Sequence, residues 1–220
     1  SSTIHVVTEH HCSNSGLGPL RNFYKTIGKI IFASAAASTN KGTQGGTGIA
    51  IDTHIDVTVT VPAGKNVTSG HDWTSCVLEA KGTRILLITV YLTHGIGYSG
   101  VNVTKLGQIA VCIRAFRLPW ILLGDFNMPP ATLQATPFVT NLRATVVLPT
   151  AEITCRQGAG SLIDYAVTGN GGQTLVHSYA PDPHSRTTPH TALIMTITAT
   201  PRQVTTRQVI KPQAIPPGPP

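Results

Sequence analysis

The stretch WILLGDFNMPP, residues 120–130, decides the fold of this chain. Its first four residues form an apolar run that is too short for a helix and suits a buried strand. The glycine that follows ends the run, and the closing Met-Pro-Pro stops the strand. If the backbone stays extended, Asp125 and Asn127 point the same way at the strand end. A carboxylate beside a carboxamide suits a hard cation and a phosphate, so the stretch indicates a functional site, with a simple Asx turn as the alternative.

The composition predicts one globular domain with a basic surplus. A chain of 220 residues is long enough for one sizeable core, and a hydrophobic content of 41% is normal. There are 16 Lys and Arg against 9 Asp and Glu, a net charge of +7, but no run of basic residues. This surplus favours polyanionic partners, nucleic acid among them, through a diffuse attraction. No apolar stretch reaches the roughly 18 residues that a membrane span needs.

The cysteines and the start of the chain bear on where the protein works. Four cysteines lie far apart without a CxxC pair, which argues against a zinc site and for reduced, structural thiols: Cys12, Cys76, Cys112 and Cys155. No signal peptide precedes the glycosylation sequons at Asn66 and Asn102, so we expect an intracellular protein, nuclear or cytoplasmic. The chain starts without methionine just before a strand pattern, and we expect it to be a piece of a longer protein.

The apolar spacing predicts two packed sheets with helices on the outside, within residues 1–199. Helical spacing occurs at 16–27 and 99–116, and residues 132–142 are ambiguous. On the second helix the apolar face comprises Val103, Leu106, Ile109, Ala110, Ile113 and Phe116. Strand patterns occur at 4–8, 29–33, 49–52, 55–61, 74–80, 84–91, 120–123, 145–148, 161–167, 174–178 and 192–198. Residues 200–220 are proline-rich and indicate a flexible tail or linker.

Several polar residues lie at the end of an apolar strand pattern, within one or just before one. Glu9 closes the first strand pattern, and Asp164 lies inside the apolar run LIDYAV, where a carboxylate needs a cation or a partner. His190, just before the last strand pattern, is a natural partner for a carboxylate, although alone it would be read as a surface residue. The glycine-rich loop at 42–48 precedes a strand and lacks the GK[ST] ending of a P-loop, so it indicates a hairpin or a strand-entry turn.

Taken in order, these features form a series: a glutamate after the first strand, YxxH at a strand end, GDFN, IDY, and a histidine before the last strand. The series resembles the endonuclease/exonuclease/phosphatase superfamily across residues 4–198, and most of all the endonuclease domains of LINE-type retrotransposons. The superfamily also includes apurinic-site endonucleases and deoxyribonuclease I. The resemblance implies an α/β fold, a four-layer α/β/β/α sandwich of two packed mixed sheets.

The resemblance also implies roles for single residues. Glu9 would ligate Mg²⁺, or Mn²⁺ in its place, and Tyr91 would contact the scissile phosphate. His94 stands where the family motif commonly has asparagine, and it would bind substrate. Apart from the resemblance, Arg156 and Arg186 lie in loops near the predicted site and are candidate phosphate contacts.

The remaining roles concern the attack on phosphorus. Asp125 would orient or deprotonate the attacking water, and Asn127 would hold water and phosphate. Asp164 would orient His190, which would act on the phosphate as acid, base or charge stabiliser. The chemistry is that of phosphodiester hydrolysis, in which a cation neutralises a phosphate oxygen and a carboxylate positions water.

Two features depart from the family pattern. The closing motif is Thr188-Pro189-His190 instead of Ser-Asp-His, so an aspartate that normally contributes to the metal site is replaced by proline. The family's first strand, with an asparagine near the metal, has no counterpart before Ser1, which predicts an unpaired inner edge. We therefore expect this piece to be less active and less stable than its parent protein.

The resulting hypothesis is a Mg²⁺-dependent phosphodiesterase that nicks DNA, the endonuclease domain of a retrotransposon-like polyprotein with a covalently linked reverse transcriptase. One alternative is a phosphatase of the same fold that acts on a small phosphoester. Another is a degenerate domain that binds nucleic acid without cutting it. Cleavage specificity would come from loops such as 94–101 and 182–188.

Overall fold

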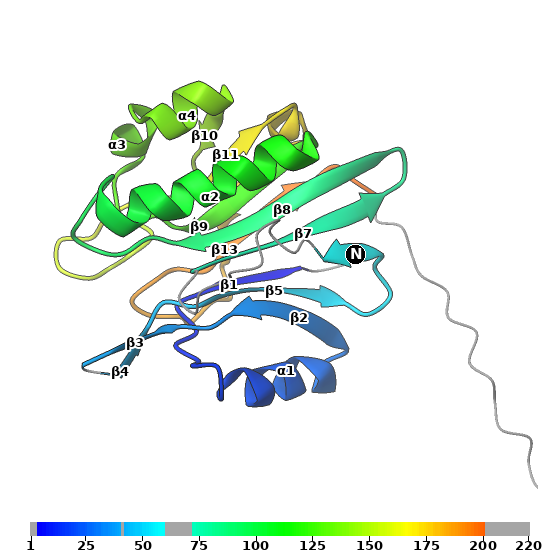
Figure 1. Ribbon diagram of the computed structural model, residues 1–220, viewed down its shortest axis with the longest axis horizontal. Helices are drawn as coiled ribbons and strands as arrows, with labels where there is room; N and C mark the ends of the chain where they lie inside the picture. Colours follow the sequence, from blue (N-terminus) through cyan, green and yellow to red (C-terminus); the bar gives the residue numbers. More distant parts are fainter. Residues whose placement is uncertain (1–3, 41, 60–71, 201–220) are drawn as a thin grey trace, which may run out of the picture.

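Two packed sheets with helices on both outer faces form the protein (Figure 1). The computed structural model describes residues 4–40, 42–59 and 72–200. Helix α1 (Leu17–Thr26) forms one outer layer, and the other outer layer holds α2 (Gly100–Phe116), α3 (Pro130–Gln134) and α4 (Pro137–Leu142). The α/β/β/α architecture expected from the sequence is therefore confirmed.

The larger sheet has six strands in the order β10-β11-β9-β8-β7-β6. Their bounds are β6 Val57–Val59, β7 Trp73–Ala80, β8 Thr83–Tyr91, β9 Trp120–Asp125, β10 Thr145–Val147 and β11 Asp164–Gly169. Strands β7 and β8 form a hairpin, whereas β8 and β9 run parallel because α2 carries the chain back between them. A Cβ on Gly124 would lie 2.0 Å from the carbonyl oxygen of Val90, so the close approach of β8 and β9 requires glycine there.

The smaller sheet has the order β1-β5-β2, with β1 His5–Thr8, β5 Thr47–Asp52 and β2 Lys29–Ser34. Two further strand pairs are β3 Ala37–Thr39 with β4 Gly42–Gln44, and β12 Val176–Pro181 with β13 Leu193–Ile197. The glycine-rich loop thus forms half of a hairpin and leads into β5, as its sequence indicated. Among the described strands β1 pairs only with β5.

Three apolar clusters separate the four layers. The largest lies between the six-stranded sheet and α2, α3 and α4, and includes Leu106, Trp120, Leu122, Phe126 and Tyr165. A second cluster lies between the sheets and includes Ile49, Ile51, Ile85, Leu87 and Ile121. A third, under α1, contains Tyr24, Ile31 and Ala50. Strand β9 contributes to the first two clusters, so its apolar run is buried on both faces, as the sequence predicted.

Helix α2 differs from its expected orientation. Val103, placed on the apolar face from its spacing, is 39% exposed, whereas Asn102 and Lys105 are buried. The expectation was wrong at the start of the helix because hydrophobic spacing cannot identify polar side chains that have buried partners. The buried side chain of Asn102 also removes its sequon from the surface, and Asn66 lies outside the described residues.

Other segments differ in their bounds. The ambiguous segment 132–142 forms two short helices, because Pro137 begins α4 at a position where its missing N–H is not needed. Strand β12 starts later than its pattern suggested, because Gly172–Leu175 form the short 3-10 helix η1. Residues 60 and 61 of one strand pattern and residues 201–220 of the expected linker lie outside the described residues.

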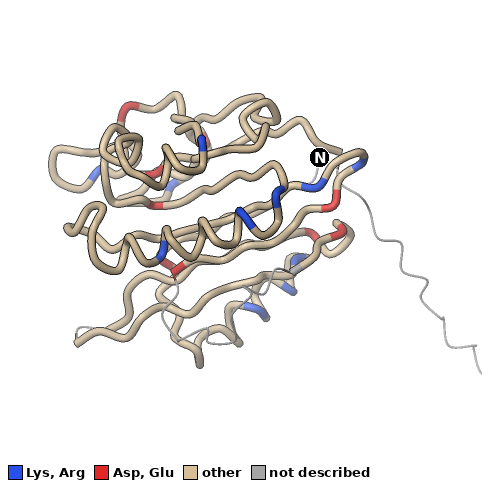
Figure 2. The backbone as a smooth tube through the Cα atoms, turned by 45° about the horizontal axis from the view of Figure 1, so that its top comes forward, with Lys and Arg blue, Asp and Glu red and all other residues tan. Residues whose placement is uncertain are grey.

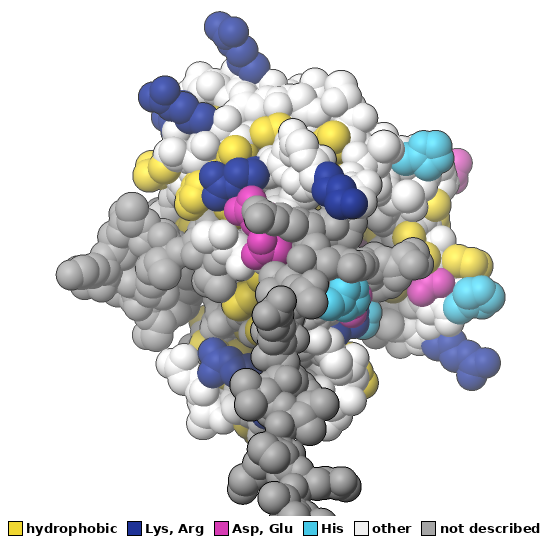
Figure 3. Space-filling model, turned by 90° about the vertical axis from the view of Figure 1, so that its right-hand side faces the viewer, with side chains coloured by type: hydrophobic (Ala, Val, Ile, Leu, Met, Phe, Trp, Pro, Cys, Tyr) yellow, Lys and Arg dark blue, Asp and Glu magenta, His cyan; other side chains and the backbone are white. Residues whose placement is uncertain are grey.

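Charged residues are spread over the molecule. Lys and Arg lie on α1, on α2 and near the β7–β8 turn, with Asp and Glu among them (Figure 2). Figure 3 likewise shows basic side chains scattered over one face, with acidic and histidine side chains between them. All of the Asp and Glu lie in described segments, whereas five basic residues lie outside: Lys41, Lys65, Arg202, Arg207 and Lys211. The described surface is therefore less basic than the whole chain.

Most of the cysteine thiols lie in the core. All four cysteines are free, and Cys76, Cys112 and Cys155 are buried. Burial raises the pKa of the Cys76 thiol to about 12, so this group is unreactive. None of the helices in the described segments combines the length and the apolar character needed to cross a membrane.

Candidate active site

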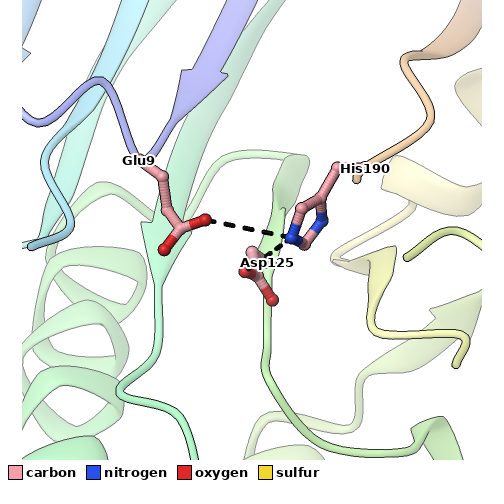
Figure 4. Close-up of side chains that lie close together, drawn as sticks. All are labelled: Glu9, Asp125 and His190. Carbon is pink, nitrogen blue, oxygen red and sulfur yellow. Dashed lines mark ion pairs between the residues drawn. The ribbon is translucent and has the colours of Figure 1, made fainter. Parts of the chain in front are cut away.

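The polar residues singled out in the sequence meet at one end of the strands (Figure 4). Glu9 follows β1, and Asp125 is the last residue of β9. Asp164 is the first residue of β11 and stands opposite Asp125 in the antiparallel register. His190 lies three residues before β13, and its ring points toward Glu9 and Asp125. Four chain segments that are far apart in sequence thus contribute to one cluster.

His190 lies at the centre of this cluster. Its Nδ1 atom is 2.9 Å from Asp164 Oδ2, while its Nε2 atom is 3.8 Å from Glu9 Oε2 and 4.0 Å from Asp125 Oδ2. The hydrogen bond to Asp164 raises the pKa of His190 to about 9, so the imidazole is cationic at neutral pH. The partnership between Asp164 and His190 proposed from the sequence is present in the structure.

Asp125 is a buried carboxylate that is difficult to ionise. Only 1% of the residue is exposed. Burial, and then the negative charge of Asp164, raise the pKa of Asp125 to about 7. Two hydrogen bonds from Asn127 hold the carboxylate: the backbone N–H donates to Oδ1 at 2.9 Å, and Nδ2 donates to Oδ2 at 3.1 Å.

Asp125 and Asn127 of the GDFN motif do contact each other, but not by the geometry expected from the sequence. Strand β9 ends at Asp125, and Asn127 has a φ of 48°, so the backbone turns instead of staying extended. The backbone N–H of Asn127 bonded to the Asp125 side chain is an Asx turn, which was the alternative interpretation. Phe126 between them is fully buried and stacks on Tyr165 with 4.3 Å between ring centres. The turn therefore places Asn127 against the Asp125 carboxylate.

Tyr91 completes the cluster on the side of β8. It is the last residue of β8, pairs with Asp125 in the parallel register and is 2% exposed. Gln44 Nε2 donates to its hydroxyl oxygen at 3.0 Å. Burial, and then the carboxylate of Glu9, raise the pKa of Tyr91, so the phenol stays protonated and can donate a hydrogen bond.

The ligand atoms of the cluster fit a divalent cation. Glu9 and Asp125 each offer a carboxylate oxygen, and these atoms and a ring nitrogen of His190 lie within 4.8 Å of one another; the described residues contain one such group. While His190 is cationic its ring has no free lone pair, so the two carboxylates are the ligands. Carboxylate oxygens are the ligands that Mg²⁺ and Mn²⁺ prefer. Since Glu9, Asp125 and Asp164 face a single imidazole, ionisation of all three carboxylates leaves a negative excess that a cation would offset.

Comparison with known proteins identifies the family of the chain. Residues 6–190 match the model of the Endonuclease/Exonuclease/phosphatase family. The chain belongs to this family. No protein in the curated set of sequences matches the chain.

Several solved structures share the fold at low sequence identity. The 3'-5' exonuclease (NExo) from Neisseria Meningitidis is 17% identical, with 88% of each chain covered and a TM-score of 0.60. The endonuclease domain of TRAS1, a telomere-specific non-LTR retrotransposon, is 17% identical, with 77% of this chain and 78% of that chain covered and a TM-score of 0.61. The AP endonuclease LMAP from Leishmania major is 11% identical, with 87% and 77% covered and a TM-score of 0.65.

The histidine that departs from the family motif lies beside the cluster. His94 is exposed, and its Nδ1 atom is 3.0 Å from Asn127 Oδ1. The Nδ2 group of Asn127 donates to Leu92 O at 2.8 Å as well as to Asp125. Both amide N–H groups of Asn127 are therefore engaged within the protein, and His94 contacts its amide oxygen.

The two arginines proposed as phosphate contacts are exposed on loops. The backbone N–H of Arg156 donates to Pro189 O at 2.9 Å, which places this loop directly beside His190. Arg186 lies in the segment between Asp182 and His190. Among the described residues, neither guanidinium forms an ion pair with the carboxylates of the cluster.

Pro189 stands where the family motif has an aspartate. Among the described residues of the cluster, no additional carboxylate takes the place of that aspartate. Pro189 follows a cis peptide bond, and its carbonyl accepts a hydrogen bond from Arg156. Asp182, the nearest acidic residue in sequence, instead accepts from the backbone N–H of His184 at 2.9 Å. The carboxylates that face His190 are those of Glu9, Asp125 and Asp164.

A buried threonine that the sequence did not reveal holds Asp164 in place. Thr154 is fully buried, and its hydroxyl oxygen accepts hydrogen bonds from the N–H groups of Ile163 and Asp164 at 3.1 and 3.0 Å. Its carbonyl also accepts from Thr191, next to His190, at 2.7 Å. No local pattern marks Thr154, because its partners lie nine or more residues along the chain.

Replacing this threonine tests its contribution. Thr154→Val keeps the shape and leaves two buried N–H groups without an acceptor, so we expect a loss of about 1–3 kcal/mol in the free energy of unfolding. Urea denaturation measures it. Thr174→Val is the control, because the Thr174 hydroxyl is exposed and donates only to the nearby Gly171 O. Equal stability of the Thr154→Val and Thr174→Val proteins would contradict the assignment.

Proposed function

We propose that this chain is a Mg²⁺-dependent phosphodiester hydrolase that nicks DNA, with Mn²⁺ able to replace Mg²⁺. The observation that carries the proposal is the convergence of Glu9, Asp125 and His190, with Asp164 bonded to the far side of the imidazole. Membership of a family of nucleases and phosphatases supports hydrolysis of a phosphoester. Glu9 and Asp125 would hold the cation, which when bound would supply positive charge for a phosphate oxygen.

The roles we propose for the side chains follow from their contacts. Asp125 orients the attacking water and accepts its proton, for which a raised pKa is suited. Asn127 orients the Asp125 carboxylate through its two hydrogen bonds. His190, held cationic by Asp164, stabilises the charge that develops on the phosphate or protonates the leaving oxygen.

Tyr91, His94 and two loop arginines would contact the substrate. The hydroxyl of Tyr91 donates to a phosphate oxygen, since its pKa is raised and it remains protonated. His94 is exposed beside Asn127, and Arg156 and Arg186 lie on the loops that precede His190. We propose that these three residues bind backbone phosphates of the nucleic acid.

The biological setting is part of the proposal. A fold shared with the endonuclease domain of TRAS1 and a net charge of +7 support a DNA substrate in a retrotransposon-like polyprotein. Residues 1–199 would be the nuclease domain. Residues 200–220 would form a proline-rich linker toward a reverse transcriptase.

The decisive experiment is nicking of supercoiled plasmid by purified protein, with Mg²⁺, with Mn²⁺ and with EDTA. We expect conversion to open circles that requires the cation. The control is His177→Ala, an exposed histidine on β12 outside the cluster, which should nick like the wild type. Hydrolysis of p-nitrophenyl phosphate without nicking would instead indicate the small-phosphoester phosphatase. A folded protein with neither activity would indicate the degenerate domain and refute the proposal.

Cation binding is tested without activity. We expect Mn²⁺ at millimolar concentration to raise the melting temperature of the wild type, because it binds the folded cluster only. The rise should shrink strongly in Glu9→Gln, which removes one carboxylate from the cluster. Glu152→Gln, an exposed acidic residue, is the matched control and should respond like the wild type. A rise of the same size in Glu9→Gln would rule out Glu9 as a ligand.

A further inference from the structure

Helix α2 buries two polar side chains against the segment that carries Tyr91 and His94. Asn102 is fully buried, and Lys105 is 7% exposed. The two residues stand three positions apart and therefore share one face of the helix. A buried ammonium and a buried carboxamide are costly unless their polar atoms find partners. Their partners thus indicate what this face of α2 does.

Lys105 uses all of its hydrogen-bonding capacity beside Tyr91. Its ammonium donates to Asp72 Oδ2 at 2.6 Å, to the carbonyl of Tyr91 at 3.1 Å and to Thr93 Oγ1 at 3.2 Å. These bonds account for the three N–H groups of the side chain. The ammonium also lies 5.6 Å from the centre of the Tyr91 ring, within the range of a cation–π contact. Lys105 therefore contacts both the backbone and the ring of Tyr91.

Asp72 connects Lys105 to the glycine-rich loop. Its Oδ1 atom accepts from the N–H of Gly46 at 2.9 Å, and its carbonyl accepts from the N–H of Tyr91 at 2.8 Å. A Cβ on Gly45 would lie 2.4 Å from Asp72 Oδ1 and 2.8 Å from Tyr91 Cδ1. The neighbouring Gln44 then reaches the Tyr91 hydroxyl. Gly45 is thus required for the close packing of this loop against Asp72 and Tyr91.

Asn102 holds the loop on which His94 stands. Its Oδ1 atom accepts from the N–H of Thr93 at 2.7 Å, while its Nδ2 group donates to Thr93 O at 3.0 Å and to Gly97 O at 2.9 Å. The side chain therefore closes residues 93–97 into a fixed turn. His94 lies inside this turn, with its ring against Asn127.

We propose that Lys105, Asp72 and Asn102 form a buried polar clamp that positions Tyr91 and His94 for the reaction. The three side chains touch neither the Glu9 nor the Asp125 carboxylate, so they are positioning residues and act through Tyr91 and the turn. The kinetic consequence rests on the proposed function, whereas the structural consequence does not. The two are tested separately.

The kinetic test removes both charges of the clamp at once, so that no unpaired charge stays buried. We expect the double variant Lys105→Met/Asp72→Asn to lower kcat for nicking by about 10²-fold, because small displacements of a substrate-binding group are costly. The matched control is Lys29→Met/Asp52→Asn, which removes the similarly buried ion pair between β2 and β5, away from the cluster. A loss of kcat of the same size in the control would overturn the proposal.

A double-mutant cycle separates positioning from general stability. In a Tyr91→Phe background the clamp substitutions should lower kcat by no more than about threefold, because the hydroxyl that they position is already absent. Full additivity of the two effects would mean that the clamp does not act through Tyr91.

Hydrogen–deuterium exchange tests the structural part of the proposal, and it does so whether or not the protein is active. In Lys105→Met/Asp72→Asn we expect faster exchange at residues 44–46 and 91–97, with β5 and β9 unchanged. Gly45→Ala should have a similar effect, whereas Gly82→Ala should not, because Gly82 has the same positive φ but open space around it. Unchanged exchange at 91–97 would refute the clamp. If the wild type fails to nick, the proposed function is lost and this measurement alone decides the inference.

Discussion

Asp125→Asn should abolish nicking and at the same time make the protein more stable. The substitution keeps the shape of the side chain but removes the group that we propose as proton acceptor and as partner of the cation. We expect kcat to fall by about 10³-fold or more, the range in which a catalytic base and a charge-stabilising group act together. Plasmid nicking at saturating Mg²⁺ measures the loss.

The gain in stability has a defined pH dependence in the absence of metal. The pKa of Asp125 is raised to about 7 in the folded protein, so ionisation destabilises the fold. This cost is absent below the unfolded pKa of the group, grows as pH rises toward 7 and is constant above it. Asp125→Asn should therefore add roughly 2 kcal/mol at pH 8 in EDTA, after the loss of one hydrogen bond from Asn127, and little at pH 4.

A second aspartate provides the matched control. Asp52 is paired with the buried Lys29, so Asp52→Asn should lower stability at pH 8 instead of raising it. Urea denaturation of both variants at several pH values gives the comparison. A destabilised Asp125→Asn protein at pH 8 would show that the carboxylate is compensated in the fold, and it would weaken the argument that the site requires a cation.

His190→Ala should have the second largest effect, a loss of kcat of about 10²- to 10⁴-fold with the plasmid substrate. The imidazole is the one cationic group among three carboxylates, and no neighbouring side chain in the described cluster replaces it. His177→Ala, on the exposed face of β12, should retain activity. An active His190→Ala protein would exclude the proposed role.

The ion pair of His190 with Asp164 also predicts a pH profile of stability. The hydrogen bond to Asp164 raises the pKa of His190 from 6.5 to about 9. The stabilisation is therefore fully present below pH 6.5 and is lost as pH rises through about 9. In EDTA we expect the wild type to lose roughly 2 kcal/mol over this window. Asp164→Asn should flatten the profile between pH 6.5 and 9, and an unchanged slope would count against the pair.

Local sequence patterns were sufficient for most of the elements and for the residue types that form the cluster. The run from Trp120 to Leu123 predicted a strand buried on both faces, because all four consecutive positions are apolar. The order of Glu9, Asp125, Asp164 and His190 along the chain indicated the family and its four layers. Such features are encoded within a few residues, so they can be read without knowing the partners of any side chain.

What the patterns could not provide were contacts between elements. Asp125 and Asn127 meet through a turn with a positive φ at Asn127, not through an extended strand, because a side chain–backbone hydrogen bond there outweighs continuation of the strand. Thr154 supports Asp164 from a distant loop.

The sequence by itself determined the layers, the strand that carries GDFN and the residue types that would gather at its end. Only the tertiary structure decided that Lys105 and Asn102 face inward while Val103 faces solvent. The physical reason is that hydrophobic periodicity reports the transfer of apolar groups from water, whereas a polar side chain is buried only when partners from other elements satisfy it. Those partners, Asp72, Tyr91 and Thr93, are brought to α2 by the register of β7 and β8 and by the packing of the helix on the sheet.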